Sequence, residues 1–463
     1  MQDAKALSEK LLYKKKTVYE MTDAAHIERA YEYARGYAAY LDAAKTEREA
    51  VRESIRLAEQ NGFVSYSFGD AVVTGGKYYY NNRGKNLFLF TVGNEPLENG
   101  IRISAAHIDS PRLDLKQAPL FEDSGMSFLK THYYGGIRKY QWVTVPLALH
   151  GVVVKKDGST VEVLIGEDEQ DPVFYINDLL PHLGRADEKK PISEVISGEK
   201  LNILVGSRPF DGEGDTDAIK LQTMLLLHEK YGITEEDFLS AELSAVPAFK
   251  ARDIGFDRSM IGAYGHDDRV CAYPALSAIF DSADSSHPLM CVLADKEETG
   301  SDGNTGMKCD LLLDLINALA RSLGADPAVV RANSKCLSAD VSAAFDPNFP
   351  EVFEKRNSSL LSAGVVLTKF TGSGGKSGTN DASAEYVGWL RGVMDRAGVV
   401  WQTAELGRVD CGGGGTVAKF LSAHNIETVD LGVPVISMHA PYEVVSKVDL
   451  YEAYRAFCAF SRE

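Results

Sequence analysis

Five short apolar runs, each followed by a side chain that can bind a metal ion, constrain this chain more than any other feature. The residues at or just after the ends of these runs are His107, Asp267, the pair Glu297 and Glu298, Asp340 and His439. Short apolar runs bounded by turn signals are typical of buried strands, and in an open α/β sheet the ligand site lies at the carboxyl ends of strands. The pattern therefore predicts a sheet whose strand ends bring these side chains together.

The centre of this pattern is the end of the run 288–294, which leads into Glu297 and Glu298. A turn with two glycines follows over 299–303, and a helix is expected after it. Because adjacent residues on a strand point to opposite faces, one glutamate could bind a metal while the other faces the substrate. The spacing alone leaves open which glutamate has which part.

Two histidines with three or four carboxylates form a ligand set for a pair of divalent metals such as Zn²⁺ or Mn²⁺. One aspartate can bridge both metals. Such a pair lowers the pKa of a shared water and polarises a carbonyl, and a spare carboxylate then acts as general base. Each residue alone has an ordinary explanation: a structural histidine, a cap or turn aspartate, or a solvated glutamate pair. Several apolar strands that all end this way are hard to explain as solvated surface.

The chain alternates between strands and helices from about residue 248 onward, which indicates an α/β sheet covered by helices. Helices are also expected over 4–14 and 24–60. Residues 115–247 differ, since they consist of short β-rich runs with few candidate catalytic residues. We expect a mixed-sheet α/β catalytic domain formed by 1–114 and 248–463, with a β-rich domain, 115–247, inserted into it. The later helices are predicted at 269–281, 309–323, 381–397, 415–424 and 447–461, and the later strands at 288–295, 335–341, 361–368, 398–404 and 427–437.

The overall charge excludes some classes of partner. The 463 residues carry a formal charge of −17, which disfavours nucleic acid and anionic membranes. No apolar run approaches the length that spans a bilayer, and the N-terminus does not resemble a signal peptide. The six cysteines include no CxxC pair, as in a protein of a reducing compartment. These features favour a cytoplasmic enzyme.

Two further features lie close to the candidate ligands. Asp109, two residues after His107, could accept the second ring N–H of that histidine and fix its tautomer; the alternative is a turn aspartate before Ser110 and Pro111. The glycine run 412–415, which includes Gly413 and Gly414, opens a predicted helix, and its backbone N–H groups could hold an oxyanion or a carboxylate. The alternative for this run is a plain flexible turn. The second glycine-rich stretch, 371–379, is not a P-loop, because Phe370 stands where that motif needs glycine.

Several motifs in a fixed order carry a resemblance to a known family. They are Ala106-His107-Ile108-Asp109-Ser110-Pro111-Arg112, Asp267-Asp268-Arg269, Glu297-Glu298-Thr299-Gly300-Ser301, Ser338-Ala339-Asp340, residues 410–416, and Ser437-Met438-His439-Ala440-Pro441-Tyr442-Glu443. With these motifs the chain resembles the M18 metallopeptidases, the aspartyl aminopeptidase family, over nearly its whole length.

The resemblance implies a two-zinc aminopeptidase, although Mn²⁺ and Co²⁺ share this ligand chemistry. It implies that Asp267 bridges the metals, that Glu297 is the general base and that Asp109 orients His107. The remaining metal ligands it implies are His107, Glu298, Asp340 and His439. It further implies that the inserted domain mediates dimerisation, and that dimers assemble into a tetrahedral dodecamer that encloses a chamber.

The resemblance also implies two substrate-binding residues. His182, in the inserted domain, matches a histidine that in some members reaches the active site of a neighbouring subunit. Lys376, in the loop Gly375-Lys376-Ser377, matches the base expected to pair with an acidic substrate side chain. Ala343 is a departure from the pattern, because well-studied aspartyl aminopeptidases carry a histidine at this place. It leaves the ligand set intact and concerns specificity.

The expected function is therefore removal of the N-terminal residue from peptides, with acidic residues as the candidate preference. One alternative is a two-metal deacylase or carboxypeptidase on a related fold. Another is an inactive assembly scaffold of the same fold, against which the intact ligand set and Glu297 argue.

Overall fold

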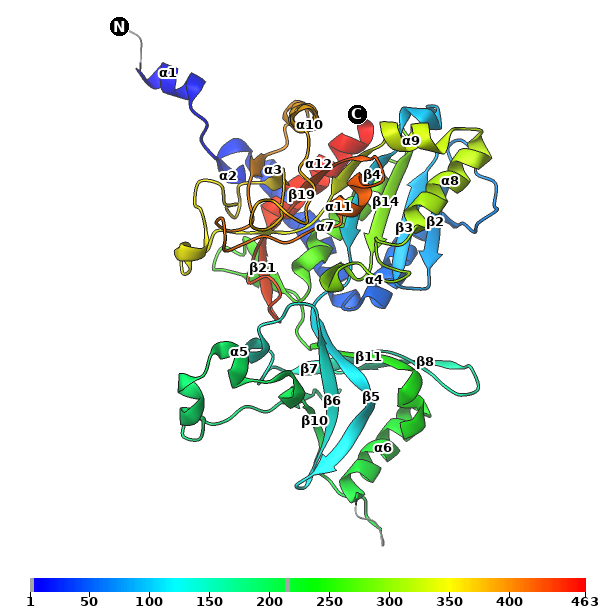
Figure 1. Cartoon of the computed structure of the whole chain (residues 1–463), viewed down its shortest axis with the longest axis vertical. Coiled ribbons are helices and arrows are strands. Elements are labelled where there is room, and N and C mark those ends of the chain that lie inside the picture. The colour runs from blue at the N-terminus through cyan, green and yellow to red at the C-terminus, as the bar shows by residue number, and fades with distance from the viewer. Residues whose placement is uncertain (1–3, 213–216) are drawn as a thin grey trace.

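A nine-stranded mixed sheet forms the centre of the larger of two lobes (Figure 1). The computed structural model describes residues 4–212 and 217–463. The strand order is β1–β2–β3–β14–β4–β15–β19–β17–β18. The four central strands, β14, β4, β15 and β19, are parallel, so their carboxyl ends lie at one edge of the sheet. The strands are β1 (Val64–Ser65), β2 (Lys77–Asn82), β3 (Asn86–Thr91), β4 (Arg102–His107), β14 (Leu289–Ala294), β15 (Lys335–Ser338), β17 (Val365–Thr368), β18 (Trp401–Thr403) and β19 (Glu427–Gly432).

Helices cover both faces of this sheet, and strand β14 shows how the sequence produces this arrangement. Cys291 and Leu293 pack with the helices of one face, while Met290 and Val292 pack with those of the other. Because both faces of a central strand are buried, its sequence is apolar throughout rather than alternating. The first face carries α3 (Ala24–Ala43), α4 (Glu47–Gln60), α7 (His266–Asp281), α10 (Ala384–Arg396) and α12 (Lys447–Arg462), and the second carries α8 (Leu311–Leu323), α9 (Pro327–Asn333) and α11 (Ala418–Ser422).

The structure divides two segments that the sequence predicts to be continuous. The stretch 24–60 is two helices, because Thr46 begins α4 with a capping box in which Thr46 and Glu49 exchange hydrogen bonds. The stretch 427–437 leaves the large sheet after β19 and enters a five-stranded sheet of order β12–β13–β21–β20–β16. The strands of this smaller sheet are β12 (Arg252–Ile254), β13 (Met260–Ala263), β16 (Ser342–Ala343), β20 (Pro434–Ile436) and β21 (Glu443–Ser446).

The smaller lobe is built on a seven-stranded antiparallel sheet of order β8–β7–β11–β5–β6–β10–β9 (Figure 1). It has its own apolar core, which includes Trp142 and Leu147. Helix α6 in this lobe was not predicted, because the surrounding runs are β-rich. The elements are β5 (Arg112–Asp123), β6 (Met126–Tyr134), β7 (Leu147–Val154), β8 (Thr160–Ile165), β9 (Tyr175–Ile176), α5 (Ile192–Val195), β10 (Ile203–Gly206), α6 (Ala218–Tyr231) and β11 (Ala241–Pro247).

Buried ion pairs join the two lobes. Lys45, which precedes α4, pairs with Glu167 at 2.6 Å, and Glu49 of α4 meets His150 of β7 at 2.8 Å. The chain begins with α1 (Ala4–Leu11) and α2 (Val18–Met21). Over 4–212 and 217–463, the structure contains no helix with both the length and the apolar character that crossing a membrane requires.

Candidate metal centre

The structure brings the predicted strand-end residues together at one edge of the large sheet. His107 ends β4, Glu297 and Glu298 form a short turn of helix after β14, and Asp340 follows β15. Asp267 lies in the first turn of α7, and His439 lies in the connection between β20 and β21. All six side chains line one cavity of about 490 Å³. This convergence follows from the parallel order of β14, β4 and β15.

Asp267 lies between the two histidines. Its Oδ1 is 3.2 Å from Nε2 of His107, and its Oδ2 is 3.1 Å from Nε2 of His439. Nε2 of His439 is also 3.4 Å from Oε2 of Glu298. Ligand atoms of His107, Asp267 and Glu298 all lie within 4.8 Å of one another. One carboxylate is thus placed so that each of its oxygens could serve a different ion.

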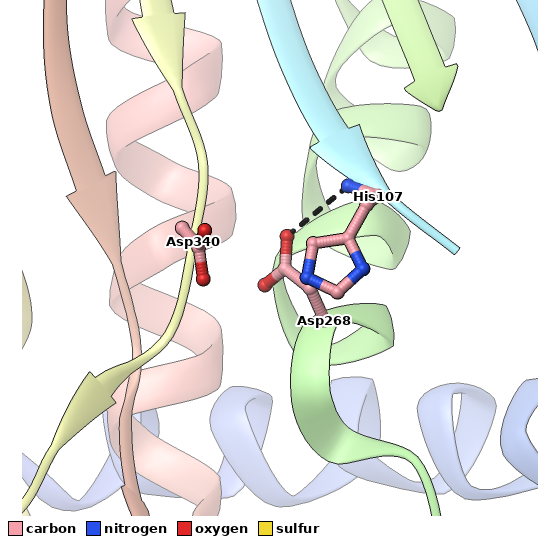
Figure 2. Close-up of side chains that lie close together, drawn as sticks. All are labelled: His107, Asp268 and Asp340. Atoms are coloured by element: carbon pink, nitrogen blue, oxygen red, sulfur yellow. Dashed lines mark hydrogen bonds between the residues drawn. The ribbon is translucent and has the colours of Figure 1, made fainter. Parts of the chain in front are cut away.

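His107 also belongs to a second group of possible ligands, and Figure 2 shows its side chain close to those of Asp268 and Asp340. Ligand atoms of these three residues lie within 4.8 Å of one another. Oδ2 of Asp268 accepts a hydrogen bond from the backbone N–H of His107 at 3.3 Å. Sequence reasoning does not place Asp268 in the site, because an aspartate at the start of a helix is usually a cap.

Both histidines are oriented by a carbonyl oxygen behind the ring. Nδ1 of His107 lies 3.0 Å from the backbone oxygen of Asp109, and Nδ1 of His439 lies 2.7 Å from that of Gly136. Since a carbonyl only accepts, Nδ1 carries a proton in each ring, which leaves Nε2 as the nitrogen that can bind a metal ion. Gly136 follows β6 of the smaller lobe, so that lobe contributes to the site.

The electrostatics of the cluster fit divalent cations. Burial, together with neighbouring carboxylates, raises the pKa values of Glu298 and Asp340 well above their usual range. Oε1 of Glu298 and Oδ1 of Asp268 are buried without a hydrogen-bond donor. Buried carboxylates without donors are costly unless a cation neutralises them. Carboxylate oxygens and imidazole nitrogens at this spacing form a suitable donor set for Zn²⁺.

Asp109 connects His107 to the glutamate pair. Its Oδ1 accepts the backbone N–H of Glu297 at 3.1 Å, and its Oδ2 accepts that of Glu298 at 3.2 Å and the hydroxyl of Tyr134 at 2.7 Å. Burial alone would raise the pKa of Asp109, but hydrogen bonds from His107 and Tyr134 hold it below its usual value. Asp109 is therefore a charged acceptor that fixes both the turn and the histidine ring.

Glu443 is a residue of the site that sequence reasoning missed. It is 1% exposed, and its carboxylate accepts the backbone N–H of His439 at 2.7 Å and that of Asp267 at 3.1 Å. Burial and the charge of Asp267 raise the pKa of Glu443 to about 8. The one indication of Glu443 in the sequence is its place at the end of the motif 437–443. The spacing of residues along the chain does not predict contacts with backbone N–H groups.

The predicted substrate-binding residues fall into two sets. Gly413 and Gly414 line the cavity. Lys376 instead pairs with Asp381 at 3.1 Å, and His182 lies in an exposed turn of the smaller lobe. Within the described chain, neither Lys376 nor His182 lines this cavity.

Replacing Gly432 with alanine is expected to disrupt the placement of Asp340. A Cβ at 432 would lie 1.6 Å from the backbone oxygen of Asp340, a clash that only backbone movement can relieve. We expect a loss of at least about 2 kcal/mol in the free energy of unfolding and weaker zinc binding, measured by urea denaturation and metal analysis. The matched control is Gly388→Ala in α10, where nothing lies within 4 Å and alanine should add about 0.5–1 kcal/mol. Wild-type stability and zinc content in the Gly432→Ala variant would contradict this account.

Comparisons with known proteins are consistent with the geometry. Residues 40–461 match the family described as aminopeptidase I zinc metalloprotease (M18). The chain is 48% identical over 458 residues to the probable M18 family aminopeptidase 1 of Clostridium acetobutylicum, covering 97% of this chain and 98% of that protein. It superposes on the crystal structure of an M18 family aminopeptidase from Thermotoga maritima with a TM-score of 0.93 at 42% identity, covering 97% of this chain and all of that one. A structure of the S. cerevisiae mApe1 dodecamer shares the fold, with a TM-score of 0.76 at 21% identity, covering 94% of this chain and 97% of that one.

Proposed function

Because the chain belongs to the M18 family of zinc metalloproteases and is an aminopeptidase, we propose that it acts with two divalent ions held at the centre described above. The observation that carries this proposal is the position of Asp267, with one carboxylate oxygen facing each histidine. Asp267 would be the ligand shared by the two ions, and His107, Glu298, Asp340 and His439 would be the other residues that hold them. Zinc is the proposed metal, and Mn²⁺ and Co²⁺ are the alternatives with the same ligand chemistry.

When bound, the ions lower the pKa of a water and polarise the scissile carbonyl. Glu297 lines the cavity and is the proposed general base: a carboxylate oxygen takes the proton of the attacking water and later delivers it to the leaving amine. Burial raises the pKa of Glu297 above its usual value, which suits a group that must both accept and release a proton near neutral pH. Asp109 and Glu443 hold the backbone around the ligands. The N–H groups of Gly413 and Gly414 are proposed to face the developing oxyanion.

A deacylase or a carboxypeptidase would use similar ions, so substrate specificity is what distinguishes these activities from that of an aminopeptidase. The experiment is a panel of aminoacyl p-nitroanilides beside N-acyl amino acids, assayed on the metal-reconstituted full-length enzyme. We expect turnover of the free-amine substrates, and at least a hundredfold lower kcat/KM for the acylated compounds. Turnover of the acylated compounds alone would refute the proposed activity, and no turnover of either class would favour an inactive scaffold.

Self-association is the second part of the proposal. The smaller lobe is proposed to mediate dimerisation, and the dimers are proposed to form a dodecamer; the yeast relative is described as a dodecamer. Exposed apolar side chains of this lobe support an interface there, among them Leu179, Leu180 and Leu183. His182 stands within the same stretch and is proposed to reach the cavity of a partner subunit. The mass in solution, as a multiple of the 50.5 kDa chain, tests the assembly.

A further inference from the structure

The cavity has a second charged feature besides the metal centre. Part of its wall is formed by glycines 413–415 and the start of α11, and Lys419 of that helix lines it. Among the described residues that line the cavity, Lys419 is the one lysine or arginine. The other charged groups of the lining are the acids and histidines already assigned to the metal centre.

The position of the Lys419 ammonium depends on the glycine run. A Cβ at position 415 would lie 2.7 Å from Nζ of Lys419 and 2.6 Å from the backbone oxygen of Gly378. Glycine at 415 therefore leaves the space in which the ammonium rests against the cavity wall. Nζ also lies 4.8 Å from the ring centroid of Phe420, a second lining residue. The side chain is thus packed at the wall rather than extended into solvent.

The ammonium of Lys419 differs from its neighbours in having no anionic partner. Lys376 and Lys369 both pair with Asp381, and Lys308 pairs with Asp302 at 2.8 Å. Lys419 makes no ion pair within the part of the chain that the structure describes, although acidic residues outnumber basic ones 66 to 49. The unpaired ammonium of Lys419 on the cavity wall is therefore placed to bind an anionic group of a peptide substrate.

We propose that Lys419 is the carboxylate receptor of this cavity, binding a carboxylate group of the peptide substrate through its ammonium. This inference rests on the proposed aminopeptidase activity. Two parts of a peptide supply the same chemistry: an acidic side chain of the N-terminal residue, and the C-terminal carboxylate of a short peptide. A lysine suits either, because it acts as a compact charge on a flexible stem rather than as a planar fork. With this role for Lys419, selectivity for charged substrates depends on α11 rather than on the loop that contains Lys376.

The test measures selectivity with two matched substrate pairs on the metal-reconstituted full-length enzyme. Glu- and Gln-p-nitroanilide differ only in the side-chain carboxylate, and Leu-Leu and Leu-Leu-amide differ only at the C-terminus. For each pair, selectivity is the kcat/KM of the substrate with the carboxylate divided by that of the uncharged substrate. Lys419→Gln is expected to lower this ratio about tenfold or more in one of the two pairs, because hydrogen bonds between charged groups are stronger than those between neutral groups. The affected pair identifies the source of the carboxylate. Lys419→Arg should retain most of the ratio, and Lys419→Glu should shift the preference towards Lys- and Arg-p-nitroanilide.

The control is Lys308→Gln, because the Lys308 ammonium also lies near the Phe420 ring, 5.8 Å from its centroid, yet is paired with Asp302. It should leave both ratios unchanged. Unchanged ratios in Lys419→Gln would overturn the inference, as would loss of the ratio in Lys376→Gln instead. An enzyme that cleaves none of the four substrates would refute the proposed function itself, a result distinct from activity without charge selectivity.

Discussion

Replacing Glu297 with glutamine is expected to reduce kcat about a thousandfold or more, while zinc content and folding remain those of the wild type. General-base catalysis contributes rate factors of about 10²–10⁴, and an amide cannot take the proton of the attacking water. The substitution keeps the size of the side chain. It also keeps the backbone N–H of residue 297, which is what Asp109 holds. The measurements are kcat on an aminoacyl p-nitroanilide, metal content after dialysis, and the circular dichroism spectrum.

Glu298→Gln is the comparison that separates the two glutamates. Its Oε2 lies 3.4 Å from Nε2 of His439, and its other oxygen is buried without a donor. We therefore expect Glu298→Gln to lose zinc as well as activity. If Glu297→Gln lost zinc instead, Glu297 would be a ligand. If it kept wild-type turnover, the base would lie elsewhere.

The large sheet and the convergence of most candidate ligands were predictable because their signals are local. The run that forms β14 is apolar throughout, since both of its faces are buried, and Glu297 and Glu298 follow at its end. Asp340 likewise follows the end of a strand, β15. The switch from β19 to β20 was not predictable, because both strands are largely buried and only long-range pairing assigns them to different sheets.

Residues that position the ligands through backbone contacts were harder to find. Glu443 and Asp268 each accept backbone N–H groups of ligand residues, and such contacts leave no spacing in the sequence. Lys376 shows the opposite problem. Its place in a motif predicts that it lines the cavity. Its ammonium instead pairs with Asp381, and the lysine that lines the cavity is Lys419. The strand-end residues therefore line the cavity as their motifs indicate, whereas Lys376, on a loop, does not line it.

Replacing Asp267 with asparagine is expected to abolish turnover and to lower the zinc content below the proposed two ions per chain. A bridging ligand needs two anionic oxygens, and asparagine offers one neutral oxygen. The thermal response should change as well. Because an ion that binds only the folded state stabilises it by mass action, by about 2.7 kcal/mol at a hundredfold excess over Kd, zinc should raise the Tm of the metal-free wild type. Asp267→Asn should lose most of that rise.

Asp268→Asn is the matched variant for this experiment. The two aspartates are adjacent and both buried, but Asp268 directs Oδ2 to the backbone N–H of His107, a contact that an asparagine oxygen can keep. We expect Asp268→Asn to retain the zinc-dependent rise in Tm. An equal loss in both variants would make Asp268 a metal ligand beside Asp340, and retention in both would remove Asp267 from the bridge. Burial alone would raise the pKa of Asp267, but hydrogen bonds from His107 and His439 hold it below its usual value in the metal-free protein. The metal-free Asp267→Asn protein should therefore have a lower Tm than the metal-free wild type. For this reason the rise in Tm upon zinc addition, rather than the Tm itself, distinguishes loss of a ligand from general damage to the fold.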